Sequence, residues 1–302
     1  MTRVATFAMH QNLFGAIARS QGKLATAQLN MATGKKAVDF SSLGIAAGNT
    51  LSARSLLARQ EAHKGVAERL GTTLALYDAH LSGTEEAMSS LRTKLLNAVG
   101  TGQTAGLQGA IEEAFGRFRT SLNADEAGQP LFAGSQTQAP PFTASSLADT
   151  VGLAASEAFT NDDVRASAKA GDGQDLTFGI TASDVGTELF NAFRTLAEAG
   201  AIGPSPTAAQ REAIETAVGQ INDGLKTVRA VWAENGRRQA QVESITTRGE
   251  ERSLILQQLI DRNENANMAE VASTLTQQQA ALEASYTVFA RLSGLSLVNY
   301  LR

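Results

Sequence analysis

The sequence contains no cysteine, which excludes disulfide bonds, thiolate metal sites and cysteine nucleophiles. Aromatic residues are also scarce, at 5% of the 302 residues, whereas about one residue in six is alanine. Large aromatic side chains usually supply much of a compact core. Alanine has the highest helix propensity, and its small side chain lets helix axes approach each other closely. The composition therefore predicts long, closely packed helices.

Positive charge is neither abundant nor clustered. The net charge is −4 at pH 7, and nucleic-acid binding depends on clustered Lys and Arg side chains, so we expect no nucleic-acid partner. No run of 18 apolar residues occurs, and the only basic residues in 263–302 are Arg291 and Arg302. We therefore expect no membrane insertion, either as a spanning helix or as a basic amphipathic one. The first residues also lack the apolar core that is typical of a cleaved signal peptide.

All five prolines lie between positions 130 and 206. A proline inside a helix costs about 3 kcal/mol, so the two proline-free arms can be helical while the centre cannot. In the centre, the alternation of Leu176, Phe178 and Ile180 predicts a short strand, and the Gly-Asp-Gly of residues 171–173 predicts a hairpin turn before it. The middle segment is therefore predicted to be a small β domain inserted between helical arms.

Apolar residues recur at alternating spacings of four and three residues between positions 70 and 95. This heptad pattern is typical of a long helix that packs along one face. We predict a helix from about Ser52 to Gly100, followed by a second helix over about 107–122. The heptad residues are interpreted as the internal core of a helical rod; they are Leu70, Leu74, Tyr77, Leu81, Met88, Leu91 and Leu95.

Both ends of the chain carry narrower versions of the same pattern. Large apolar residues alternate there with small or polar ones, so neither helix can bury its face alone. The two ends are predicted to pair as antiparallel helices and to keep some surface for packing against other subunits. At the N-terminal end the predicted assembly residues are Leu13, Ile17, Leu24 and Met31. At the C-terminal end they are Met268, Leu275, Leu282, Tyr286, Phe289, Leu292, Leu295, Leu297 and Leu301.

Together these patterns predict a mainly α fold with a small inserted β domain and a long antiparallel coiled coil formed by both chain ends. Residues 1–42 and 265–302 would form the terminal coiled-coil domain. Residues 43–129 and 185–264 would form a helical rod domain, and residues 130–184 a small β-rich outer domain.

The sequence contains no arrangement that is typical of a catalytic or cofactor-binding site. The three histidines, His10, His63 and His80, are too far apart in sequence for metal-ligand spacing. Residues 34–36 (Gly-Lys-Lys) lack the upstream glycine of a phosphate-binding loop, because Leu29 stands in its place. We therefore expect no enzyme activity and no cofactor.

Two charged segments have simpler interpretations than a binding site. Residues 161–163 (Asn-Asp-Asp) could hold a cation, but they lack the spaced ligands of a calcium loop, so a plain turn is favoured and no metal is expected. The charged residues in 250–252 and 261–264 are interpreted as helix-surface pairs, because they fall at the spacing at which helical neighbours interact.

Several segments of the chain resemble a known protein family. Residues 24–39 contain Gly34, Lys35 and Asp39 at the positions of a segment found in bacterial flagellins, and residues 279–286 resemble part of the last flagellin helix. The chain is therefore similar to the flagellin family.

Three other segments resemble one branch of that family, the hook-associated proteins that join the flagellar hook to the filament. These are residues 130–142, 188–196 and 295–301. In the first of them, the residues that match the branch pattern are Phe132, Gly134, Pro141 and Phe142.

The resemblance implies an elongated, flagellin-like structural subunit that is exported unfolded through the flagellar type III apparatus. Such a subunit would fold on assembly into a ring at the hook–filament junction, outside the cell, with its terminal helices as the inner layer. The implied partners are identical subunits, a neighbouring hook-associated protein, flagellin and, before secretion, an export chaperone. Two alternatives are filament flagellin and, more distantly, a coiled-coil type III secreted translocator or effector.

Overall fold

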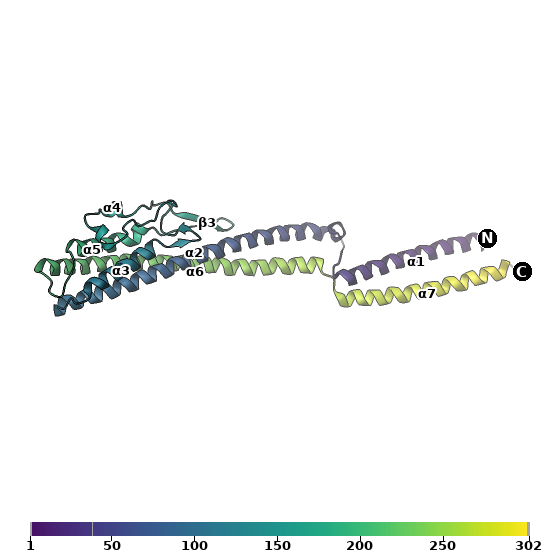
Figure 1. Cartoon of the computed structure of the whole chain (residues 1–302). Helices are drawn as coiled ribbons and strands as arrows, with labels where there is room; N and C mark the ends of the chain where they lie inside the picture. Colours follow the sequence, from purple (N-terminus) through teal and green to yellow (C-terminus); the bar gives the residue numbers. More distant parts are fainter. Residues whose placement is uncertain (1, 38, 301–302) are drawn as a thin grey trace. The chain divides into compact units, whose positions relative to one another are not determined.

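The computed structural model describes residues 2–37 and 39–300, except for the side chains of residues 2–10 and 292–300. It is 74% helical, with two small antiparallel sheets, which confirms the predicted mainly α fold with a small β part (Figure 1). The helices are α1 (Thr2–Thr33), α2 (Ile45–Thr101), α3 (Leu107–Leu122), α4 (Ala155–Ala158), α5 (Ala182–Glu198), α6 (Ala208–Glu264) and α7 (Met268–Tyr300). Two short 3₁₀ turns are η1 (Phe40–Leu43) and η2 (Leu147–Thr150), and the strands are β1 (Asp125–Glu126), β2 (Gln129–Pro130), β3 (Ala166–Gly171) and β4 (Gln174–Phe178).

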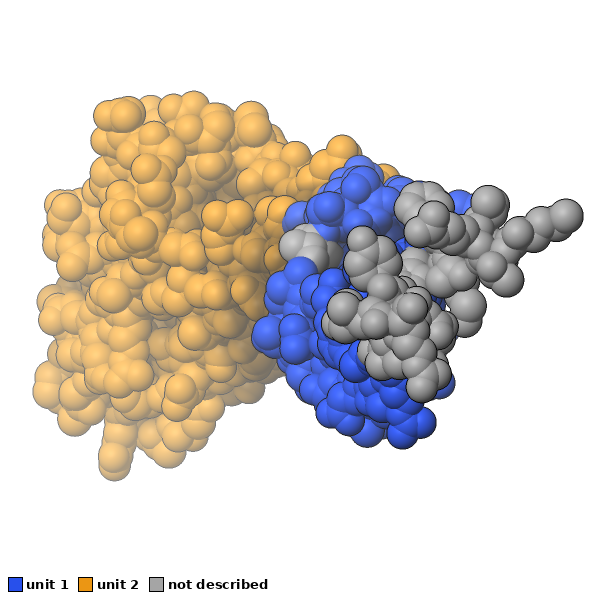
Figure 2. Space-filling view, turned by 90° about the vertical axis from the view of Figure 1, so that its right-hand side faces the viewer, with its two compact units in different colours: residues 1–59, 251–302 blue, residues 60–250 orange. Residues whose placement is uncertain are grey.

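The chain forms two compact units, which Figure 2 shows in different colours. Unit 1 comprises residues 1–59 and 251–302, and unit 2 comprises residues 60–250. The boundary between them falls within α2 and within α6, so each of these helices belongs partly to both units. The division into three domains that we predicted from the sequence stays a prediction.

Unit 2 has its core where α2, α3, α5 and α6 pack together. All seven heptad residues predicted between positions 70 and 95 are buried in it. Helix α2 begins at Ile45, earlier than the predicted start near Ser52, because Gly44 ends the preceding turn with a φ of +58°. The helix ends close to the predicted position, since Gly102 adopts a φ of +69° and its N–H donates to the carbonyl of Ala98 at 2.9 Å.

A cluster of phenylalanines forms the centre of this core. Phe142 lies among Phe115, Phe118 and Phe190, with ring centroids 6.0, 5.4 and 6.0 Å away. Phe132 is also buried and meets the ring of Tyr77 edge-on at 5.1 Å. Edge-to-face aromatic pairs of this kind stabilise a core beyond their buried area. The two phenylalanines of the family motif are therefore core residues.

The middle segment contains the predicted hairpin, and much of the rest of it is irregular. Strands β3 and β4 form an antiparallel hairpin whose turn, Asp172–Gly173, lies within the predicted turn at 171–173. Strands β1 and β2 form a second, two-residue hairpin. In the described residues between 131 and 165, regular structure is otherwise limited to η2 and α4, and most of this stretch consists of turns. Side-chain hydrogen bonds to the backbone hold these turns together.

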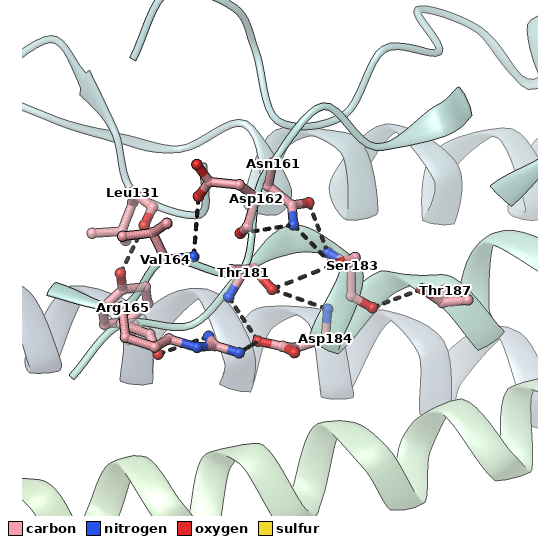
Figure 3. Close-up of polar contacts among 11 residues, drawn as sticks. Leu131, Asn161, Asp162, Val164, Arg165, Thr181, Ser183, Asp184 and Thr187 are labelled. Carbon is pink, nitrogen blue, oxygen red and sulfur yellow. Dashed lines mark hydrogen bonds and ion pairs between the residues drawn. The ribbon is translucent and has the colours of Figure 1, made fainter. Parts of the chain in front are cut away.

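Asp162 organises the largest group of these hydrogen bonds, and Figure 3 shows the bond to its carboxylate from Val164. Its carboxylate accepts bonds from the backbone N–H groups of Ser135 at 2.8 Å and Val164 at 3.2 Å, from the Ser135 hydroxyl, and from the amide of Gln136 at 3.0 Å. The Ser135 donors are the main reason why the pKa of Asp162 lies well below its ordinary value. The carboxylate oxygens of Asp162 therefore accept hydrogen bonds from the protein itself and stabilise this turn.

The same network fixes the start of α5. Asn161 donates to the hydroxyl of Ser183 at 2.8 Å, and Thr181 and Asp184 form a capping box. Arg165 adds an ion pair to Asp184 at 2.6 Å. Because Thr181 caps the helix, α5 begins at Ala182.

Gly134 of the family motif is required by this network. Its φ is +67°, and a β-carbon built there would lie 2.2 Å from the carboxylate and 2.6 Å from the carbonyl oxygen of Asp162. Gly128 has a similar φ of +82° but open space around it. The two glycines therefore share a backbone preference and differ in crowding.

We predict that Gly134→Ala destabilises unit 2 by about 3 kcal/mol and that Gly128→Ala costs only about 1 kcal/mol, the ordinary penalty of a left-handed alanine. Chemical denaturation of the two full-length variants, followed by circular dichroism, measures both values. Equal losses would show that contact with Asp162 does not constrain position 134.

Candidate assembly interface

The two ends of the chain pair as antiparallel helices, as predicted. Helices α1 and α7 lie side by side along their length (Figure 1). The ring of Phe14 meets that of Phe289 edge-on, with centroids 5.1 Å apart, and the Gln21 amide donates to the hydroxyl of Tyr286 at 2.7 Å. These contacts join residues that are more than 260 positions apart in the sequence.

The predicted assembly residues fall into three groups by exposure. Ile17 and Leu282 are buried between the helices. The half-buried residues are Leu13, Leu24, Met31, Leu275 and Phe289, and the exposed ones are Met268 and Tyr286. The side chains of Leu292, Leu295 and Leu297, and the whole of Leu301, lie outside the described residues.

The described part of the α1–α7 pair has a thin core. Besides Ile17 and Leu282, the only other hydrophobic residue buried there is Ala27. Several large apolar side chains of the pair face solvent instead; they are Phe14 (56% exposed), Tyr286 (48%), Val288 (47%), Leu29 (43%) and Met268 (43%). Exposed apolar residues gathered on one pair of helices are typical of a surface that binds another protein.

This surface also carries few charges. Residues 11–33 and 268–291 include five charged side chains: Arg19, Lys23, Glu270, Glu283 and Arg291. The other polar groups are mainly Gln, Ser, Thr and Asn. A partner could therefore cover the surface without removing many charges from water, and the centres of protein interfaces are depleted of charge in the same way.

A groove lies between α1 and α7 near the loops that follow α1 and precede α7. It has a volume of about 630 Å³. Small side chains line it on both sides, including Gly22, Thr26 and Ala27 from α1 and Val271 and Thr274 from α7. Because these residues are small, the two helices leave room between them for side chains from outside.

The loops next to this groove are held by one buried acidic residue. Glu264, at the end of α6, is 6% exposed. Its carboxylate accepts two hydrogen bonds from the guanidinium of Arg54, at 2.9 and 2.7 Å, and lies 3.4 Å from the Nζ of Lys35. Bidentate Arg–carboxylate pairs are among the stronger ionic contacts in proteins. The bonds from Arg54 are the main reason why the pKa of Glu264 lies below its ordinary value.

The family motif residues near the N-terminus belong to the same structure. Gly34 ends α1 with a φ of +69°, and its carbonyl accepts a 2.8 Å bond from the N–H of Ala266. The Nζ of Lys35 also donates to the side-chain oxygen of Asn265 at 2.7 Å. Asp39 caps η1 by accepting from the N–H of Ser42 at 2.8 Å. Two chain segments that lie far apart in the sequence are thus joined where α1 ends and α7 begins.

The interpretation of residues 261–264 as helix-surface pairs was wrong for Glu264. Its partners, Arg54 and Lys35, are more than 200 positions away, and its side chain is buried. Sequence reasoning also missed Arg54, because an isolated arginine on a helix carries no local signal of a distant partner. The one available hint was the proximity of Glu264 to the predicted domain boundary at 265.

The described residues contain no group of three or more His, Asp or Glu side chains that is arranged to hold a metal ion. Within the same part of the chain, no helix is long and apolar enough to cross a membrane.

No protein-family model matches the chain, but two curated proteins match it from end to end. Flagellar hook-associated protein 3 of Escherichia coli K12 is 27% identical over 319 residues, and the match covers 98% of both chains. Flagellar hook-associated protein 3 of Salmonella typhimurium is 25% identical over 320 residues, with the same coverage.

The chain is similar along almost its whole length to flagellar hook-associated protein 3.

Two solved structures share the fold of this chain. A Vibrio parahaemolyticus protein assigned to the flagellar hook-associated proteins aligns with a TM-score of 0.60 at 18% identity, over 72% of this chain and 97% of its own. Bacillus cereus FlgL aligns with a TM-score of 0.59 at 15% identity, over 70% and 99%. The flagellin-family resemblance of the sequence is thereby confirmed.

We predict that replacing Glu264 by glutamine loosens the loops that follow α1 and precede α7. Arg54 and Lys35, whose side chains are 50% and 44% exposed, would lose their common counter-charge, at a cost of about 1 kcal/mol. Hydrogen exchange at the Lys36 and Ala266 amides, which bond to Glu264 and Gly34, measures the loss.

The effect should depend on pH with a defined sign. Because the folded state lowers the pKa of Glu264, the carboxylate stabilises the fold fully above its unfolded pKa, ordinarily 4.5, and less as the pH falls through the folded pKa. Wild type and Glu264→Gln should therefore differ at pH 7 and converge in acid. Glu251→Gln removes the same charge from an exposed position on α6. It should change neither the stability nor the hydrogen exchange of the Lys36 and Ala266 amides. A difference that persists in acid would contradict an ionic role for Glu264.

Proposed function

We propose that this chain is a structural subunit of the bacterial flagellum that forms the junction between hook and filament. The observation that carries this proposal is the match to two hook-associated proteins over 98% of each chain. That match includes both terminal helices and the middle segment. Both curated relatives are hook-associated proteins, which favours the junction over filament flagellin and over a secreted translocator or effector.

The geometry of α1 and α7 supports an assembly role. The described part of the pair buries three hydrophobic residues and exposes five large ones. Such a pair is weakly stable alone and gains stability when neighbours cover its exposed face, so ordering of the ends would be coupled to assembly. We infer that identical subunits pack through these helices into a ring, with a neighbouring hook-associated protein on one side and flagellin on the other.

The same coupling suits a subunit that is exported before it assembles. Ends that order only among neighbours do not polymerise early and can pass unfolded through the flagellar export apparatus. An export chaperone would cover the apolar residues of the ends until secretion. The homologues are structural proteins, and we assign no enzymatic role to this chain.

We expect a strain that lacks this chain to assemble hooks without filaments and to shed flagellin into the medium. The reason is that flagellin would have no junction on which to polymerise. Electron microscopy of the strain, with immunoblotting of the medium, tests this directly. Normal filaments on normal hooks would rule out a junction role.

A single substitution separates assembly from folding. Val288 is 47% exposed on α7, so Val288→Asp should leave the monomer's melting temperature unchanged while it abolishes motility, because a charge would be buried between subunits. Gln279→Asp places the same charge at an exposed polar position of α7 and serves as the control. Swarming assays measure the motility of each variant, and thermal unfolding measures its melting temperature. Full motility of the Val288 variant would place the interface elsewhere.

A further inference from the structure

One polar residue interrupts the apolar contact between α2 and α6. Ile221, Val228, Asn235 and Val242 follow one another at seven-residue intervals on α6, and all four are buried. They therefore occupy the same position of a heptad repeat. Asn235 has no exposed surface, although the residues before and after it in the repeat are aliphatic. Packing alone does not explain an amide at this place.

The amide of Asn235 makes a contact that an aliphatic side chain cannot make. Its Nδ2 donates to the backbone carbonyl of Leu74 on α2 at 2.9 Å, and the Nε2 of Gln239, one helical turn later, donates to the same oxygen at 3.0 Å. Two side chains of α6 thus converge on one carbonyl of α2. The Oδ1 of Asn235 is buried without a partner. Burying an unpaired oxygen is unfavourable, so the amide reduces stability relative to a hydrocarbon.

The residues around this contact differ from those one heptad away along α2. Gly71 of α2 faces Val242, and a β-carbon at Gly71 would lie 4.0 Å from the Cγ1 of Val242. If α6 slid by one heptad, Val242 would face Lys64 or Asp78, the residues seven positions before and after Gly71. Neither would leave the same room beside Leu74. The same two helices are also joined by the indole N–H of Trp232, which donates to the carboxylate of Asp78 at 2.6 Å. A slide would break this hydrogen bond as well.

The apolar contacts on the far side of Asn235 define the alignment less strongly. Between residues 60 and 74 of α2 and 235 and 250 of α6, the buried hydrophobic residues are Ala67, Leu70, Leu74, Val242 and Ile245. This stretch, taken by itself, would lose little apolar contact if it slid by a heptad. A directional hydrogen bond, by contrast, is lost at once.

We propose that Asn235, with Gln239 and Gly71, is a register lock that holds α2 and α6 in a single alignment in unit 2. The lock lowers stability somewhat and excludes shifted pairings of the two helices. It goes beyond the proposed function, because it concerns the internal alignment of one subunit and would operate whether or not that subunit forms a junction.

The test uses the absence of cysteine from the full-length chain. Glu61→Cys on α2 and Arg237→Cys on α6, both at exposed positions, accept nitroxide labels that lie about 20 Å apart along the helix axes. A slide of one heptad changes this separation by about 10 Å, which double electron–electron resonance resolves. Asn235→Leu is introduced into this labelled chain. Val228→Ile, at the same heptad position but away from the lock, is the control.

The labelled parent and Val228→Ile should each give one narrow distance. Asn235→Leu should melt at or above the temperature of the parent and show a second distance displaced by about 10 Å. One unchanged narrow distance in Asn235→Leu would overturn the proposal. If that variant does not fold, Gln239→Leu, which removes one of the two amides, decides in its place. A second distance would then support the lock, and a single one would overturn it.

Discussion

The antiparallel packing of α2 against α6 is the contact on which the rest of the structure depends, because both helices extend through both units. In unit 2 they provide the apolar wall against which α3 and α5 pack, with the phenylalanine cluster between them. In unit 1 the same two helices supply Arg54 and Glu264, which hold the loops that follow α1 and precede α7. Stability in the two units therefore has different sources. Unit 2 has a large aromatic core, whereas unit 1 has a few aliphatic contacts and an ionic cluster.

Features that depend on residues close together in the sequence could be predicted. The heptad spacing from Leu70 to Leu95 identified the buried face of α2, since successive turns of one helix repeat the pattern. Gly100 and Gly102 indicated the end of that helix, and the Gly-Asp-Gly of residues 171–173 indicated the hairpin. The pairing of the chain ends could also be predicted, because each end carried an apolar face too narrow to be buried alone.

Features that depend on partners far apart could not be predicted. Arg54 and Glu264 are separated by 210 positions, and no sequence pattern near either residue indicates that the two interact. Asp162 resembled a residue in a plain acidic turn, and only the fold shows that Ser135 and Gly134 surround its carboxylate. The burial of Asn235 could not be predicted for a related reason. A polar residue in a heptad repeat normally indicates an exposed position, whereas the amide of Asn235 is buried because it bonds to a backbone carbonyl on another helix.

The scarcity of charge on α1 and α7 has a consequence for the medium in which they pack. Contacts between charged side chains weaken as ionic strength rises, because dissolved ions screen them over about 8–10 Å. Contacts between apolar and uncharged polar side chains have no such dependence, and many salts strengthen apolar association. Subunits that packed through these helices would associate as strongly at high as at low salt concentration. The stability of the assembly would therefore not vary with the salinity around the cell.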